Sequence, residues 1–217
     1  MSQLGSDLVD RLKELGLRLI DQREARVLVP ALGNESGFWF GGGNLVQDKD
    51  GKILACGRFR NPGDARTGTG AGARGLEFAV FSGSSPDADF EKVMSFSKSD
   101  LSVNEEVVSI EGASLLASKT KPSGWELFVS TEKRISYPKP LINFQKPGTG
   151  VWTIDRIHGA DGLNSLSPDA METVASSQKG ETLHVKDPVA FRIKEGSTEL
   201  AYCHHPFSWA SSNTGLS

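Results

Sequence analysis

A strand–turn–strand unit recurs three times in this chain, and its spacing limits the possible folds more than any other feature. The three copies occupy residues 41–60, 109–131 and 185–203. Their turn glycines, Gly51, Gly124 and Gly196, are 73 and 72 residues apart. A fixed period of short strands is typical of repeat architectures, and for all-β repeats it favours a propeller, in which each repeat forms one blade.

A further strand that begins at a glycine follows each unit, at residues 75–81, 150–154 and 215–216. The sequence therefore predicts an all-β fold, an incomplete β-propeller preceded by a short helix. Its predicted parts are an N-terminal helix and strand in residues 1–36 and a partial propeller in 37–217. The predicted blades span about 37–101, 102–160 and 182–217.

The N-terminal segment has helical periodicity, because Leu8, Leu12 and Leu15 fall on one face between a capping Ser6 and a terminating Gly16. The sequence of residues 26–30 predicts a strand. Three blades are fewer than the four that a closed propeller needs. We therefore expect the chain to be the N-terminal part of a longer protein, or to form an assembly in which chains complete each other.

Composition excludes several classes of protein. The chain has 217 residues, of which 37% are hydrophobic, and a formal net charge of -3. The weak acidity disfavours nucleic acid as a partner, and no apolar run approaches the length of a membrane span. The charged N-terminus lacks an apolar signal core, so a cytoplasmic location is expected. In that compartment, Cys56 and Cys203 are expected to be free thiols rather than a disulfide.

One polar residue lies near the start of each repeat's first strand: Asn44, Glu111 and Asp187. Equivalent strand starts in a propeller line one end of the central channel, so these side chains are expected to converge. Two carboxylates in one pocket are what glycoside hydrolysis requires, one as acid and one as base or nucleophile. The alternative is that these residues only cap strands and bond loop backbone.

Two short motifs carry a family resemblance. Ile110-Glu111-Gly112 is similar to the E-G-P general-acid motif of the five-bladed β-propeller glycosidases, with Ala113 in place of proline. Lys186-Asp187-Pro188 resembles their D-P motifs. This group contains arabinanases and xylosidases of glycoside hydrolase family 43, invertases and levansucrases. The resemblance covers the chain from about Phe38 to the C-terminus.

The resemblance implies a five-bladed propeller and a role for each polar residue. Glu111 would be the acid, Asp187 the base or an orienting carboxylate, and Asn44 a hydrogen-bonding ligand of a sugar hydroxyl. Asn44 stands where these enzymes often have a catalytic aspartate, and an amide cannot act as a base. The expected function is that of a glycoside hydrolase-like protein acting on a glycoside or oligosaccharide. The alternative is a non-catalytic propeller that binds carbohydrate or a protein partner.

Other candidate substrate-binding residues are cationic or aromatic: Arg58, Arg60, His184, His204 and Trp209. The arginines, with neighbouring Arg66 and Arg74, could meet a ligand anion or form a solvated loop. The tryptophan, like Trp39, could stack on a sugar ring or pack in the core. No metal-ligand spacing is present, so neither metal nor other cofactor is predicted. The G-x-G-x-x-G run at residues 70–75 precedes a strand rather than a helix, which disfavours a dinucleotide site.

Overall fold

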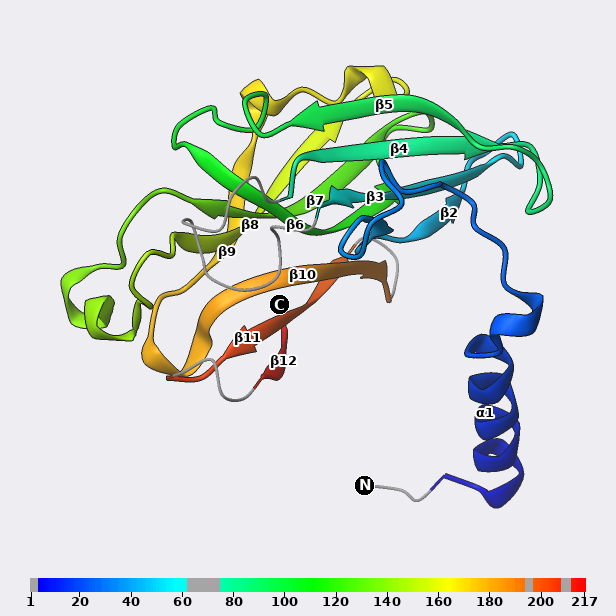
Figure 1. Cartoon of the computed structure of the whole chain (residues 1–217), viewed down its shortest axis with the longest axis horizontal. Helices are drawn as coiled ribbons and strands as arrows, with labels where there is room; N and C mark the ends of the chain where they lie inside the picture. Colours follow the sequence, from blue (N-terminus) through cyan, green and yellow to red (C-terminus); the bar gives the residue numbers. More distant parts are fainter. Residues whose placement is uncertain (1–3, 62–74, 194–196, 208–211) are drawn as a thin grey trace.

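The computed structural model describes residues 4–61, 75–193, 197–207 and 212–217, and in this part of the chain three antiparallel sheets follow one another (Figure 1). The strands of the first sheet are β1 (Trp39–Gly41), β2 (Leu45–Gln47), β3 (Ile53–Arg60), β4 (Glu77–Gly83) and β5 (Glu91–Ser97). Their order is β1-β3-β4-β5, and β2 also pairs with β3. β1 and β2 are therefore two pieces of one interrupted inner strand.

The second and third sheets repeat this pattern in simple meander order. The second contains β6 (Val107–Ala117), β7 (Trp125–Lys133), β8 (Val151–Gly159) and β9 (Glu172–Ser176). The third contains β10 (Leu183–Arg192), β11 (Thr198–His205) and β12 (Asn213–Leu216). The prediction of three successive antiparallel sheets, the last of them incomplete, is confirmed.

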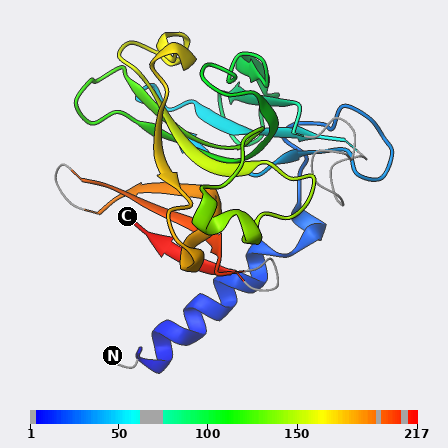
Figure 2. The same ribbon diagram turned by 90° about the vertical axis from the view of Figure 1, so that its left-hand side faces the viewer.

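The second sheet is the middle layer, and the alternation of side chains along β7 shows why. Leu127 and Val129 belong to the core that joins the second sheet to the first. Phe128, between them in sequence, packs against Ala190 and Leu200 of the third sheet. Successive residues of a strand point to opposite faces, so β7 is buried along its whole length. Figure 2 shows the third sheet lying against the second from another direction.

The N-terminal helix is present but differs from the prediction at both ends. α1 (Ser6–Leu19) is preceded by Gly5 as the capping residue, and no side chain bonds its first turn. It continues through Gly16, which does not adopt the positive φ of a helix-ending glycine. None of its residues is buried, and the helix stands away from the sheets (Figure 1).

The predicted strand at residues 26–30 was wrong. This segment pairs with no strand, and Val29 is buried on a face of the first sheet against Phe59, Ala79 and Phe81. The Arg26 guanidinium hydrogen-bonds backbone carbonyls in the β4–β5 turn. The segment therefore packs Val29 on the face of the sheet instead of extending the sheet edge.

Residues 168–176 add a short 3₁₀ turn and a strand after β8. A 3₁₀ turn covers Pro168–Ala170, and the residues after it form β9, so the second sheet extends beyond residue 160. β9 is largely exposed and lacks a strong alternation of polarity, so no local pattern predicted this strand. The other 3₁₀ segments are Gln22–Glu24, Lys139–Phe144, Leu163–Ser165 and Gly180–Thr182. Among the described residues, no helix has the length and apolar character to cross a membrane.

Candidate functional site

Each sheet's inner strand is irregular near its middle. In the first sheet, the strand breaks between Gly41 and Leu45; in the second and third, the pairing register slips just after Ile110 and Lys186. Glu111 and Asp187 lie within these β-bulges and not at strand starts, which corrects the predicted placement. A bulge bends its strand and re-aims side chains, and bulges often occur next to active sites.

Two hydrogen bonds join the three irregular segments directly. The Ala113 N–H donates to the Gly42 carbonyl over 2.7 Å, linking the second sheet to the first. The Gly112 N–H donates to Asp187 Oδ1 over 3.2 Å, linking the second sheet to the third. A β-carbon at Gly112 would lie 2.7 Å from Asp187 Oδ1, so the close approach requires glycine at this position. The structure thus brings Asp187 against the residue that follows Glu111.

Glu111 is buried and held by an ion pair. Its Oε2 accepts a hydrogen bond from Arg58 Nη2 at 2.8 Å, and its Oε1 accepts one from the Ser109 hydroxyl at 3.1 Å. The Glu111 and Arg58 side chains are only 10% and 7% exposed. A buried carboxylate requires such partners, because an unpaired charge away from water is strongly unfavourable. Both Glu111 oxygens therefore have protein partners.

Trp39 lies beside this ion pair. The guanidinium carbons of Arg58 and Arg60 are each 5.2 Å from the centre of the Trp39 ring, within cation–π distance. β1 supplies the tryptophan and β3 the arginines, and Trp39 pairs with Arg60 across the sheet. The two predicted arginines and Trp39 thus belong to one cluster with Glu111.

Asp187 is the accessible carboxylate of the group. Its side chain is 46% exposed, and its Oδ2 lies 3.8 Å from Lys186 Nζ. Its φ of 55° places it in the left-handed region, which aspartate tolerates better than most residues. The strained backbone at the bulge therefore directs this carboxylate away from the strand pairing of β10 with β11. One of its oxygens accepts a hydrogen bond from the Gly112 N–H.

Asn44 binds backbone rather than facing an open pocket. Its Nδ2 donates to the Leu115 carbonyl over 2.9 Å, and the Leu115 N–H donates to its Oδ1 over 2.8 Å. The Cys56 thiol also donates to Oδ1. The Asn44 side chain thus acts like a peptide group that pairs the first sheet with the second. Burial raises the pKa of the Cys56 thiol, and both Cys56 and Cys203 are free, as expected.

His184 belongs to a separate buried cluster. Its Nδ1 is 2.8 Å from the Tyr137 hydroxyl, and its ring meets the edge of Trp152. Burial, with smaller effects of His205 and Lys186, lowers the pKa of His184 to about 4. The imidazole is therefore neutral at pH 7 and pairs with a phenol inside the protein.

The other predicted residues do not join the bulges. His204 is buried beside Tyr202, which packs on the core between the second and third sheets. Trp209, Arg66, Arg74 and residues 70–74 of the glycine-rich run lie outside the described residues. Within the described part of the chain, no group of three His, Cys, Asp or Glu residues is placed to hold a metal ion. The cluster around the bulges therefore contains Trp39, Arg58, Arg60, Glu111 and Asp187.

In sequence, the chain matches no protein-family model and no curated protein. In structure, it is similar to a family 43 β-xylosidase/α-arabinofuranosidase from a compost microbial metagenome, solved with xylotriose, with a TM-score of 0.52 and 10% identity. A family 43 β-1,3-galactosidase matches 83% of this chain and 30% of its own, with a TM-score of 0.49 and 10% identity. A mannose phosphorylase from Leishmania mexicana matches 98% of this chain and 53% of its own, with a TM-score of 0.48 and 11% identity.

The fold is that of a partial five-bladed β-propeller. The match to the xylosidase covers 81% of this chain but 45% of the xylosidase chain. The three sheets therefore correspond to about half of the fold of that enzyme. At such low identity the match establishes the fold, while activity depends on the site itself.

Proposed function

We propose that this chain is part of a carbohydrate-active propeller that binds a glycoside or oligosaccharide where the bulged inner strands meet. In this proposal Glu111 and Asp187 are the paired carboxylates of a glycoside hydrolase. The observation that carries it is the hydrogen bond from the Gly112 N–H to Asp187 Oδ1, which ties two acid-bearing segments together from different sheets. The fold shared with a xylosidase that was solved with xylotriose supports the same class of ligand.

The chemistry assigns different work to the two carboxyl groups. The exposed Asp187 would activate water, attack the sugar or orient it, while Glu111 would protonate the leaving oxygen. Arg58 hydrogen-bonds Glu111 Oε2. The arginine must therefore move aside or bind the substrate before Glu111 can reach the leaving-group oxygen. A separation of roughly 6.5–9.5 Å between the carboxyl groups would suit inversion, and about 5–5.5 Å retention.

The second candidate function is binding without catalysis, of a carbohydrate or of a protein. The ion pair that engages Glu111 and the backbone bonds that engage Asn44 favour it, because both side chains already serve the packing of the sheets. In that case Trp39, Arg58 and Arg60 would form a binding surface, and Asp187 would accept hydrogen bonds from the ligand.

The test measures both activities on the whole chain. Release of 4-nitrophenol from xyloside, arabinofuranoside, galactoside and mannoside substrates reports turnover, and calorimetry with xylotriose reports binding. Asp187→Asn and Glu111→Gln should each lower turnover by about 10²-fold or more, since an amide is neither acid nor base. Glu126→Gln is the matched control, because Glu126 is equally buried and also pairs with arginines.

The outcomes distinguish the two candidate functions. Turnover that is lost in both variants and kept in the control supports the hydrolase. Saturable binding without turnover, weakened by Arg58→Gln, supports the binding propeller. The absence of both from the wild-type chain counts against either function.

A further inference from the structure

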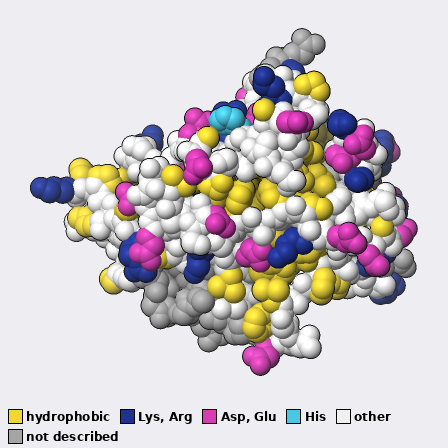
Figure 3. Space-filling model, turned by 90° about the horizontal axis from the view of Figure 1, so that it is seen from above, with side chains coloured by type: hydrophobic (Ala, Val, Ile, Leu, Met, Phe, Trp, Pro, Cys, Tyr) yellow, Lys and Arg dark blue, Asp and Glu magenta, His cyan; other side chains and the backbone are white. Residues whose placement is uncertain are grey.

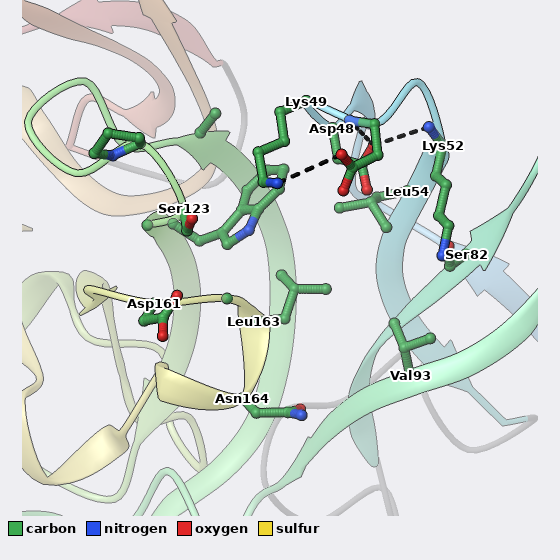
Figure 4. A pocket seen from close by; sticks show the side chains of 16 residues that line it. Asp48, Lys49, Lys52, Leu54, Ser82, Val93, Ser123, Asp161, Leu163 and Asn164 are labelled. Atoms are coloured by element: carbon green, nitrogen blue, oxygen red, sulfur yellow. Dashed lines mark hydrogen bonds and ion pairs between the residues drawn. The ribbon is translucent and has the colours of Figure 1, made fainter.

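A pocket lies between the first and second sheets, near the hairpin turns rather than at the bulges. Its volume is about 530 Å³, within the range of small-molecule sites. The β2–β3 turn, the β6–β7 turn and the segment after β8 contribute its walls (Figure 4). None of the five residues in the bulge cluster lines it. It is therefore separate from the proposed glycoside site.

Apolar side chains form one part of the lining of this pocket. Figure 4 shows Leu54, Val93 and Leu163 around the same hollow, from β3, β5 and the segment after β8. Trp125, at the start of β7, also lines it and belongs to the core between the two sheets. Val93 is 42% exposed, so the pocket keeps an accessible apolar wall. Figure 3 shows hydrophobic side chains gathered between charged ones on the face seen from above.

The rim is polar and carries both signs of charge. Asp161 and Asn164 are exposed, and in the described part of the chain no group hydrogen-bonds the Asp161 carboxylate or the Asn164 side-chain amide. Across the pocket, Lys49 pairs with Asp50. Asp48 is already used, because it accepts hydrogen bonds from the backbone of its own turn. Asp161 and Asn164 are thus polar groups that are available to a ligand.

We propose that this pocket is an accessory binding site for a neutral saccharide. A sugar ring presents C–H groups on its faces and hydroxyl groups around its edge, which matches an apolar wall with a polar rim. Asp161 accepts hydrogen bonds from hydroxyls, and Asn164 can both donate and accept them. Because lysines and aspartates share the rim, neither an anion nor a cation would gain a consistent attraction. The inference rests on this pocket alone and requires no catalytic role for Glu111.

The test uses the indole N–H signals of the whole ¹⁵N-labelled chain in a two-dimensional NMR titration. Xylotriose, maltotriose and inorganic phosphate are the probes. Trp125 reports on this pocket and Trp39 on the bulge cluster, so the two sites are read separately in one experiment. Each signal is assigned by its loss in a Trp→Phe variant. Saturable shifts of the Trp125 signal with at least one trisaccharide are expected.

Two variants probe the site from different sides. Val93→Tyr fills the hollow and should weaken trisaccharide binding at Trp125 by about tenfold or more, whereas Val174→Tyr should leave it within twofold. Val174 is a matched control because it is a similarly exposed valine, 39%, on a strand that does not line the pocket. Asp161 lies on an exposed turn. Asp161→Asn should weaken trisaccharide binding by about tenfold, since hydrogen bonds to charged groups are stronger than those to neutral groups.

The outcomes are decisive for this site. The saccharide site is supported if Val93→Tyr and Asp161→Asn reduce the Trp125 shift and Val174→Tyr leaves it unchanged. A Trp125 signal that responds to neither trisaccharide, or responds equally in all variants, overturns it. A response to phosphate alone would identify an anion site and overturn it as well. Shifts at Trp39 bear on the proposed function and leave this inference untouched.

Discussion

The buried ion pair between Glu111 and Arg58 gives the sharpest quantitative test of the structure. Removal of one member of a buried pair leaves an uncompensated charge and destabilises a protein by about 3–5 kcal/mol. The two side chains are 10% and 7% exposed, so this range applies to both Glu111→Ala and Arg58→Ala. The double variant removes both charges of this pair and should be less destabilised than the two single effects added together.

The assay is a double-mutant cycle with urea and thermal unfolding, both monitored by circular dichroism. For a chain of this size 1 kcal/mol corresponds to about 2–4 °C in Tm, so each single variant should melt roughly 6–20 °C lower. The coupling energy should reach about 2 kcal/mol or more. The exposed pair Lys92–Glu77, with side chains 46% and 24% exposed, is the control, and its cycle should give about 1 kcal/mol or less. Equal coupling energies in both cycles would refute the reasoning.

Three further predictions follow from the same contacts. Gly112→Ala should lower stability by about 1–3 kcal/mol, because its β-carbon would overlap Asp187; unfolding curves that match wild type would contradict this. The lowered pKa of His184 means that the unfolded chain takes up a proton first as the pH falls, so stability should decline from about pH 6.5 to 4. His184→Asn, which tolerates the positive φ, should flatten that decline in urea midpoints measured across this pH range. Finally, Val189 and Phe191 are exposed apolar residues of β10, 58% and 36% accessible. Their joint replacement by lysine should reduce self-association measured by light scattering, and an unchanged size distribution would argue against this face as a contact.

The repeat of turn glycines predicted the fold well because it reports local structure. A hairpin requires a turn residue and two flanking strands, all within about twenty residues, and the sequence shows these directly. The sequence did not reveal β9, because that strand is exposed and lacks the alternation that burial imposes. Residues 26–30 misled in the opposite direction: Val27, Leu28 and Val29 are apolar, but Val29 is buried on a sheet face formed largely by residues from 59 onward.

The candidate site was harder to predict than the fold, because it depends on register. Asn44 lies seven residues before its turn glycine Gly51, whereas Glu111 lies thirteen before Gly124. A bulge changes which residue faces which side of the sheet. The three polar residues therefore could not be aligned by counting alone. The pairing of Glu111 with Arg58 spans 53 positions in the sequence and also leaves no local pattern.

The same contacts that would form a catalytic centre also hold the sheets together. Asn44 pairs the first sheet with the second through Leu115, and Asp187 pairs the third with the second through Gly112. Asn44 uses both ends of its amide in this way, while Asp187 uses one carboxylate oxygen and remains 46% exposed. Since a carboxylate can accept several hydrogen bonds at once, Asp187 can keep its structural bond and still meet a ligand. Among Asn44, Glu111 and Asp187, it is thus Asp187 that remains most accessible to a ligand.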